Sequence, residues 1–451
     1  MLNILVFAKY FSYHCVMYNE NRTKANLKAT VLFVDMNSFF ASCEQQANYW
    51  LRGRPVAVCV YTGKNGAIIA PSIEAKQRGV KMGLRLEEAM KICPELVPLE
   101  TNPARYRDFH VKIISVLKKY SQDVIPRSID EAVVDLSNYQ LIYKDITQVA
   151  YAIKRDIRNE VGDWLKCSIG IAPNAFLAKL ASDMQKPDGL TIITPENIDE
   201  KLKNMPITDL PGIASGMAER LRVAGITTPL QLRYATPQYL KSACKSIIGL
   251  HWHYRLNFGE MDMQAQGYKS MQAMRQVSRE QRKKVSVLED IFLSLCMTLE
   301  RRMVKNNVFA KKLGVSIYYE DGFKYEDDIR TATPQQDGIQ MIHVFRKRML
   351  HYMEKNRCEP VINKRVTSMG VLVTDFIPSE LVQYDLFENN VRTDTIRKAV
   401  YEVKDKHGKD KIMRASELHD EPVLKDVIGF GSVKDIYEGD DDTKNPFSLQ
   451  F

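Results

Sequence analysis

The segment Ser128-Ile129-Asp130-Glu131-Ala132-Val133-Val134 places two adjacent carboxylates directly before an apolar run of strand type. Burying two neighbouring negative charges is costly unless a positive group neutralises them. Consecutive side chains of a strand point to opposite faces, so Asp130 and Glu131 can meet one cation only at a bend or a strand end. The segment therefore predicts a cation site at a strand end. The alternative that fits the segment by itself is a surface turn with two solvated acids.

A third carboxylate ends an earlier apolar run, Val31-Leu32-Phe33-Val34-Asp35. An acid at the end of a buried strand, directly before a helix start, is a usual place for a metal ligand in α/β and α+β domains. Asp35, Asp130 and Glu131 together supply the hard oxygen ligands that bind Mg²⁺ beside substrate phosphates. Two such ions about 3.5–4 Å apart can activate a 3′-hydroxyl and hold the leaving pyrophosphate. The three acids therefore indicate in-line nucleotidyl transfer with two Mg²⁺ ions.

Several segments, taken in order, resemble the Y-family translesion DNA polymerases, the impB/mucB/samB family, with likeness to DNA polymerase IV and to the catalytic subunit of polymerase V. These segments are residues 34–44, 128–132, 170–172, 176–189 and 210–213. Agreement of several motifs in one order is more specific than any single motif. The chain is therefore identified from its sequence as a member of this family.

The resemblance implies an α+β multidomain fold of the right-hand polymerase type. The expected parts are a palm (29–38 and 104–186, an antiparallel sheet with helices), small fingers (39–103), a helical thumb with a helix–hairpin–helix (187–264) and a β-α-β-β-α-β little finger (269–378). Residues 1–28 are expected to be an extension without assigned function. Residues 379–451 are expected to be a flexible C-terminal tail with one helix (393–404), a clamp-binding motif and an acidic end.

Composition agrees with an ordinary multidomain globular chain. Its 451 residues are too many for one core. The net charge of +9 is modest support for a polyanionic partner. The eight cysteines are scattered without a C-x-x-C pair, which favours reduced thiols in a cytoplasmic protein over a zinc site. The apolar residues 1–17 lack a basic leading region and are too short and mixed to span a membrane, so no membrane association is expected.

The resemblance also implies roles at the centre of the palm. Asp35, Asp130 and Glu131 would hold the two Mg²⁺ ions together with the backbone carbonyl of Met36. Lys179, on an Ala/Leu-rich helix predicted over residues 175–184, would bind the triphosphate. Without the resemblance, a solvated lysine at that place would be unremarkable.

Other substrate contacts are expected from the first helix and the fingers. Phe40, next to Phe39, would lie under the sugar and exclude a 2′-hydroxyl, whereas from the residues alone the pair reads as helix-face core. Lys76 would point toward the triphosphate with Ser72 nearby; its alternative is a solvated helix face. Here the chain departs from the commonest family pattern, which has tyrosine and arginine at the places of Ile73 and Lys76. A lysine acts on phosphate as a point charge without the arginine fork.

Two further motifs indicate macromolecular partners. Residues 210–213 before a helix predict a helix–hairpin–helix, in which Gly212, Ile213, Ser215 and Gly216 would bind DNA phosphates through backbone N–H groups. As a lone motif it could be any helix turn. In Gln383-Tyr384-Asp385-Leu386-Phe387, the side chains of Gln383, Leu386 and Phe387 would dock an extended peptide on a sliding clamp.

Basic residues crowd residues 269–312 of the expected little finger. Acids interleave with them, so part of this region reads as a solvated helix face; the acids are Glu280, Glu289, Asp290 and Glu300.

The leading hypothesis is a template-directed, error-prone DNA polymerase that uses primer-template DNA, deoxynucleotides, a sliding clamp and, as in polymerase V, accessory mutagenesis subunits. A first rival is a non-catalytic adaptor docked on the clamp, against which the presence of all three acids counts. A second rival is a nucleotide cyclase, which also uses paired acids on a palm-like sheet. The thumb motif and the clamp peptide count against the cyclase.

Overall fold

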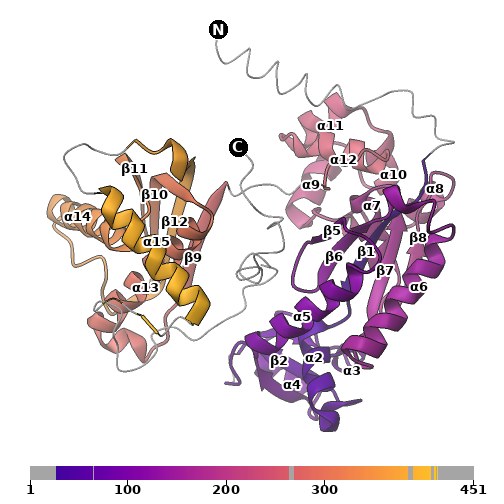
Figure 1. Ribbon diagram of the computed structural model, residues 1–451, viewed down its shortest axis with the longest axis horizontal. Helices are drawn as coiled ribbons and strands as arrows, with labels where there is room; N and C mark the ends of the chain where they lie inside the picture. The colour runs from indigo at the N-terminus through magenta and orange to yellow at the C-terminus, as the bar shows by residue number, and fades with distance from the viewer. Residues whose placement is uncertain are drawn as a thin grey trace. The chain divides into compact units, whose positions relative to one another are not determined.

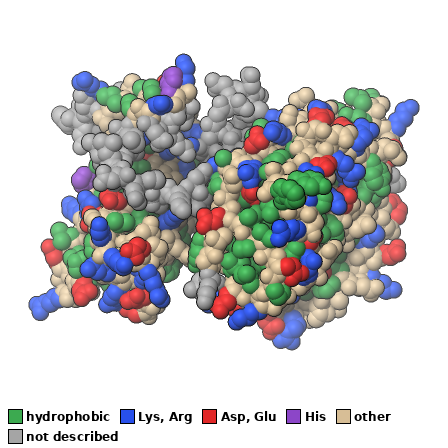
Figure 2. Space-filling view, turned by 90° about the horizontal axis from the view of Figure 1, so that it is seen from below, with side chains coloured by type: hydrophobic (Ala, Val, Ile, Leu, Met, Phe, Trp, Pro, Cys, Tyr) green, Lys and Arg blue, Asp and Glu red, His purple; other side chains and the backbone are tan. Residues whose placement is uncertain are grey.

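The computed structural model describes residues 27–63, 66–263, 269–383, 390–407, 411–412 and 414, which fall into two compact units divided between residues 265 and 266 (Figure 1). None of the helices in these ranges is long and apolar enough to cross a membrane. On the face drawn in Figure 2, Lys and Arg side chains are interspersed with Asp and Glu on each unit. On that face the positive charge is therefore not gathered into one patch.

A five-stranded sheet forms the centre of the first unit, in the order β5-β6-β1-β7-β8. Its strands are β1 (Val31–Met36), β5 (Val124–Pro126), β6 (Glu131–Asp135), β7 (Cys167–Ala172) and β8 (Leu190–Ile192). Every residue of β1 and β7 is buried, as expected for central strands with apolar sequences. The expected antiparallel pairing joins β5, β6, β1 and β7, whereas the edge strand β8 pairs with β7 in parallel.

The helices of the palm region are α5 (Pro103–Leu117), α6 (Ile146–Asp156), which continues as one π-helical turn (Ile157–Val161), and α7 (Ala175–Met184). The predicted bounds of α7 are confirmed. Asn174 caps its first turn by accepting a hydrogen bond from the N–H of Leu177.

Between β1 and α5 the chain forms a smaller sheet, β3-β2-β4, with β2 and β4 parallel. Its elements and neighbouring helices are α2 (Phe39–Ala47), β2 (Val56–Cys59), β3 (Ile68–Pro71), α3 (Ile73–Gln77), α4 (Leu86–Ile92) and β4 (Val97–Glu100). Ser38 precedes α2 in a left-handed conformation and makes no side-chain capping bond. The side chain of its neighbour Asn37 bonds to Ser168 and to the N–H of Asp188.

Five short helices complete the first unit: α8 (Ile198–Leu202), α9 (Ser215–Val223), α10 (Pro229–Tyr234), α11 (Pro237–Cys244) and α12 (Ile248–Leu256). Their apolar side chains, with Trp252 almost completely buried, join those of β1, β7 and α7 in one continuous core. The helical region is thus built onto the sheet through apolar contact.

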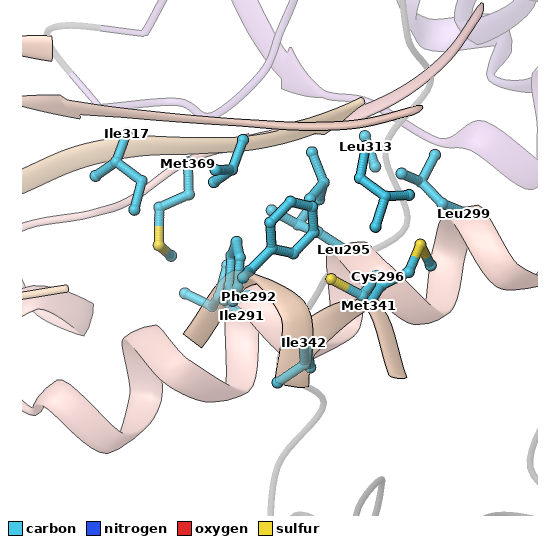
Figure 3. Packing of buried hydrophobic residues seen from close by; sticks show 14 of the residues in the cluster. Ile291, Phe292, Leu295, Cys296, Leu299, Leu313, Ile317, Met341, Ile342 and Met369 are labelled. Carbon is cyan, nitrogen blue, oxygen red and sulfur yellow. The ribbon is translucent and has the colours of Figure 1, made fainter. Parts of the chain in front are cut away.

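The second unit has the expected β-α-β-β-α-β order followed by a further helix. Its elements are β9 (Ser270–Gln276), α13 (Val285–Lys305), β10 (Val308–Tyr319), β11 (Lys324–Gln335), α14 (Gly338–Asn356), β12 (Val366–Pro378) and α15 (Asn390–His407). The strands form an antiparallel sheet in the order β11-β10-β12-β9. Figure 3 shows side chains of α13 and α14, among them Phe292, Cys296 and Met341, packed against Leu313, Ile317 and Met369 of the sheet.

The helix α15 is anchored to this unit by charge. Arg397, 4% exposed, donates to Asp394 at 2.7 Å and to Asp337 at 3.0 Å. Arg414 donates to Glu300 of α13 at 2.7 Å, and Glu300 is completely buried. The interpretation of Glu300 as part of a solvated face is therefore wrong. The part of the expected tail that the structure describes packs on the little-finger unit, whereas residues 415–451, with the acidic end, lie outside the described residues.

Candidate active site

The three predicted acids come from two neighbouring strands. Asp35 lies opposite Glu131 in the antiparallel pairing of β1 with β6, and Asp130 lies in the bend directly before β6. The N–H of Met36 donates to the carbonyl of Asp130 at 2.9 Å and ties this bend to β1. The structure thus confirms the expected placement of the acid pair at a strand end.

Lys179 of α7 lies between two of these carboxylates. Its Nζ is 2.6 Å from Asp35 Oδ2 and 2.6 Å from Glu131 Oε1, and 3.2 Å from Asp183 Oδ1. Burial alone would lower the pKa of Lys179, but the negative charges of the three carboxylates outweigh it and raise the pKa above its ordinary value. Lys179 therefore stays charged and bridges the two strands.

A glycine of β7 lets α7 approach closely enough for this contact. A Cβ at Gly170 would lie 2.0 Å from the carbonyl oxygen of Ala178 and 2.3 Å from the nitrogen of Ser182. Because these atoms belong to the backbone of α7, they cannot move aside without moving the helix. Gly170 thus sets the distance between α7 and the sheet.

Lys186, which was not among the predicted site residues, is a second cation at the centre. Its Nζ is 2.8 Å from Asp35 Oδ2 and 2.8 Å from Asp183 Oδ1. Asn37 holds the following loop by accepting from the N–H of Asp188 at 2.7 Å. The sequence offered a signal for Lys186, since it lies in the quoted motif of residues 176–189.

Asp130 does not share these lysines. Its Oδ1 accepts from the hydroxyl of Ser128, and burial raises its pKa above the ordinary value. Burial also raises the pKa of Glu131, to about 7. Asp35 is the opposite case: burial opposes ionisation, but Lys179 and Lys186 outweigh it and lower its pKa. The charge of Asp130 is thus the least compensated of the three.

The donor set fits a hard divalent cation, because Asp35 and Glu131 already converge on one positive group. The third acid does not complete the set as placed. Within the residues that the structure describes, no group of three or more His, Cys, Asp or Glu lies close enough to hold a metal ion. A metal ion held by the predicted set Asp35, Asp130 and Glu131 would therefore require these side chains to move closer together.

The two fingers residues differ in their surroundings. Lys76 of α3 is exposed. Partial desolvation and the charge of Lys186 lower its pKa, while the charges of Asp35 and Asp130 act in the opposite direction. Ser72 is completely buried, and its hydroxyl accepts from the N–H groups of Ala75 and Val56. In this structure Ser72 is a helix cap.

Phe39 and Phe40 are both buried in α2, 3% and 8% exposed. Phe40 stacks on Tyr106 of α5, with ring centroids 4.5 Å apart and an interplanar angle of 21°. This contact, between segments far apart in the sequence, was not predicted. It fixes the ring of Phe40 from one side.

The segment predicted as a helix–hairpin–helix forms a turn that leads into α9. Gly212 has a φ of 87°, a conformation that glycine adopts without strain, while Ile213 is buried in the core. Ser215 and Gly216 are exposed at the start of α9. Of the clamp peptide, Gln383 is exposed, whereas Leu386 and Phe387 lie outside the described residues.

Comparisons with known proteins identify the family of this chain. Residues 34–183 match the impB/mucB/samB family and residues 268–386 its C-terminal domain. DNA polymerase IV of Pelotomaculum thermopropionicum is 30% identical over 89% of this chain and 99% of its own length. DNA polymerase IV 1 of Bacillus subtilis is 30% identical over 87% of this chain and 94% of its own length.

Solved structures show the same fold. A Y-family DNA polymerase chimera of Dbh and Dpo4 matches with a TM-score of 0.65 at 24% identity, over 77% of this chain and 99% of the chimera. An insertion ternary complex of Dbh DNA polymerase matches with a TM-score of 0.54 at 24% identity over the same shares.

Proposed function

The chain belongs to the impB/mucB/samB family of Y-family DNA polymerases, and on this premise we propose that it is an error-prone translesion polymerase acting in DNA damage tolerance. The family and the right-hand fold expected from the sequence are thereby confirmed. The observation that carries the proposed chemistry is the convergence of Asp35 and Glu131 on one cationic group at paired strand ends.

Asp35, Asp130 and Glu131, with the carbonyl of Met36, are the proposed holders of two Mg²⁺ ions. When bound, these ions activate the primer 3′-hydroxyl and stabilise the charge on the phosphates. The chain's own contribution is positioning: β1 and β6 present the carboxylates from a rigid, buried sheet. Asp130 turns from the Ser128 hydroxyl to join the other two.

Lys179, Lys186 and Lys76 are the proposed triphosphate ligands. With Asp35 and Glu131 engaged as metal ligands, the Lys179 ammonium would keep Asp183, at 3.2 Å, as its carboxylate partner and would be available to a phosphate oxygen. Lys186 shares Asp35 and would likewise keep only its contact with Asp183, at 2.8 Å. Lys76 approaches from α3 with a charge that Asp35 and Asp130 favour. Positive groups held in a partly desolvated site stabilise the charge that develops on the leaving pyrophosphate.

Phe40, braced by Tyr106 and packed against Phe39, is the proposed sugar-selecting residue. Gly212, Ile213, Ser215 and Gly216 are proposed to bind backbone phosphates of primer-template DNA. Gln383, Leu386 and Phe387 are proposed to dock on a sliding clamp, with accessory mutagenesis subunits as further partners in the cytoplasm. The proposed domains keep the ranges expected from the sequence, except that β8 (Leu190–Ile192) extends the palm sheet. Ser72 caps, and so supports, the fingers helix that carries Lys76.

Primer extension tests the proposal with Mg²⁺, a primed template and each deoxynucleotide. The parent is expected to extend the primer, and Asp130→Asn to lose extension by at least about a hundredfold because it removes one ligand of the metal pair. Asp108→Asn, which removes only an exposed pair with Lys112, is the matched control. A parent that binds the sliding clamp but never extends a primer would favour the adaptor instead.

A further inference from the structure

His110 of α5 lies completely enclosed beside the bend that carries the two acids. Its Nδ1 is 2.7 Å from the backbone oxygen of Ile129, and the residue is 1% exposed. A carbonyl oxygen can only accept a hydrogen bond, so Nδ1 carries the proton and donates it. Burial lowers the pKa of His110 to about 4, so the ring is neutral at pH 7.

Each carbonyl of the bend from Ser128 to Glu131 accepts a hydrogen bond. The oxygen of Ser128 accepts from the N–H of Glu131, the oxygen of Asp130 from Met36, and the oxygen of Glu131 from Arg127. These donors are backbone groups of the bend and of β1. The oxygen of Ile129 instead accepts from the side chain of His110, so this contact ties the bend to α5.

The space around this contact leaves little room for a substitute. His110, Met36, Asp130 and Glu131 are among the residues that line a cavity of about 10 Å³. That volume is about the smallest that holds one water molecule. While the space keeps its shape, it therefore offers the Ile129 carbonyl at most one water molecule besides the imidazole.

We propose that His110 is a positioning residue that fixes the Ile129–Asp130 peptide and so sets the direction in which Asp130 and Glu131 present their carboxylates. This inference rests on the proposed function, because the polymerase uses these carboxylates. A chain without this contact still folds, but its bend samples orientations in which the carboxylates are misaligned. Small misplacements of this kind cost rate steeply.

The experiment compares His110→Asn with His110→Leu in the full chain. The two replacements have nearly the same shape, but the asparagine amide nitrogen takes about the place of Nδ1 and can donate, whereas leucine leaves a buried carbonyl unsatisfied. His110→Leu is expected to lower the extension rate roughly tenfold and to raise the Mg²⁺ concentration that gives half the maximal rate. His110→Asn is expected to stay within about twofold of the parent in both.

A second readout does not depend on activity. Hydrogen exchange of the backbone amides of residues 128–131 is expected to be faster in His110→Leu and unchanged in His110→Asn. An equal loss of extension rate in both variants would overturn the proposal, since it would show that His110 has a packing role alone. The proposal would also fall if His110→Leu had the extension rate and the hydrogen exchange of the parent. If His110→Leu does not fold, His110→Gln replaces it, because its amide lies too far out to reach the carbonyl. A parent that does not extend primers refutes the proposed function, and the exchange readout still decides whether His110 fixes the bend.

Discussion

Replacing Lys179 with methionine tests whether its ammonium and a metal ion compete for the same carboxylates. The substitution keeps the unbranched side chain up to its last atom but removes the charged nitrogen that lies 2.6 Å from both Asp35 and Glu131. The Asp35 side chain is 8% exposed and that of Glu131 26%, so water compensates little. Removing one partner of a buried pair costs about 3–5 kcal/mol. With the remaining exposure discounted, we expect a stability loss of about 3 kcal/mol without metal.

The free energy that Lys179→Met loses without metal should appear as tighter binding of a divalent ion. If a divalent ion relieves the whole penalty, it binds Lys179→Met about a hundredfold more tightly than the parent, since 1.4 kcal/mol is tenfold. Free Mn²⁺ measured by electron paramagnetic resonance gives the affinity, and chemical denaturation with and without Mg²⁺ gives the stability. Lys112→Met, which breaks an exposed pair with Asp108, is the control. Parental Mn²⁺ affinity in a destabilised Lys179→Met would refute the competition.

Three further predictions concern what holds the site and the second unit together. Arg397→Met leaves Asp337 and Asp394 without their main partner, so the free energy of unfolding of the second unit should fall by about 3 kcal/mol in urea; a change below about 1 kcal/mol would contradict the anchoring of α15. Gly170→Ala should force α7 away from the sheet and lower the melting temperature, whereas Gly216→Ala, where a Cβ meets nothing within 4 Å, should not. The fold lowers the pKa of His110 from 6.5 to about 4, so below pH 6.5 the unfolded chain binds the proton more readily than the folded chain. The free energy of unfolding should therefore be highest above pH 6.5 and should fall by about 3 kcal/mol as the pH is lowered to 4. Unfolding of His110→Asn measured between pH 7 and 4 should lack that part of the pH dependence.

The acids at the centre could be predicted because their placement follows from local pattern. The apolar run of β1 fixes which strand is buried, and the bend before β6 is required if adjacent acids are to face one side. Lys179 could be assigned through the motif that contains it. Its present partners could not, because they depend on how closely α7 lies on the sheet, which Gly170 controls from 9 residues away in sequence.

Contacts between distant segments could not be predicted from composition. His110 reads as one polar residue in an amphipathic helix, yet it meets a carbonyl 19 positions later. Glu300 reads as one of several solvated acids, yet it is buried because Arg414 covers it from a segment 114 positions later. In both cases the surrounding sequence looks the same as it would around a solvated polar residue. The side chain is buried only because a second, distant segment packs over it.

The uneven compensation of the acids leads to opposite expectations for two similar variants. Asp35 has two lysines, and its carboxylate holds both Lys179 and Lys186 in place. Asp35→Asn should therefore destabilise the metal-free protein. Within the described part of the chain, the side chain of Asp130 is bonded by the Ser128 hydroxyl and by no cation, and burial raises its pKa, so its negative charge opposes folding at pH 7.

Asp130→Asn removes that charge while keeping an oxygen that accepts from Ser128. We expect its melting temperature, measured in a chelator, to equal or exceed that of the parent, although primer extension is lost. A metal ligand in the metal-free protein is expected to show this combination: its charge lowers stability, yet the reaction requires it. If Asp130→Asn and Asp35→Asn lower the melting temperature equally in the presence of a chelator, Asp130 has a structural partner of its own. Its assignment as the third metal ligand would then be wrong.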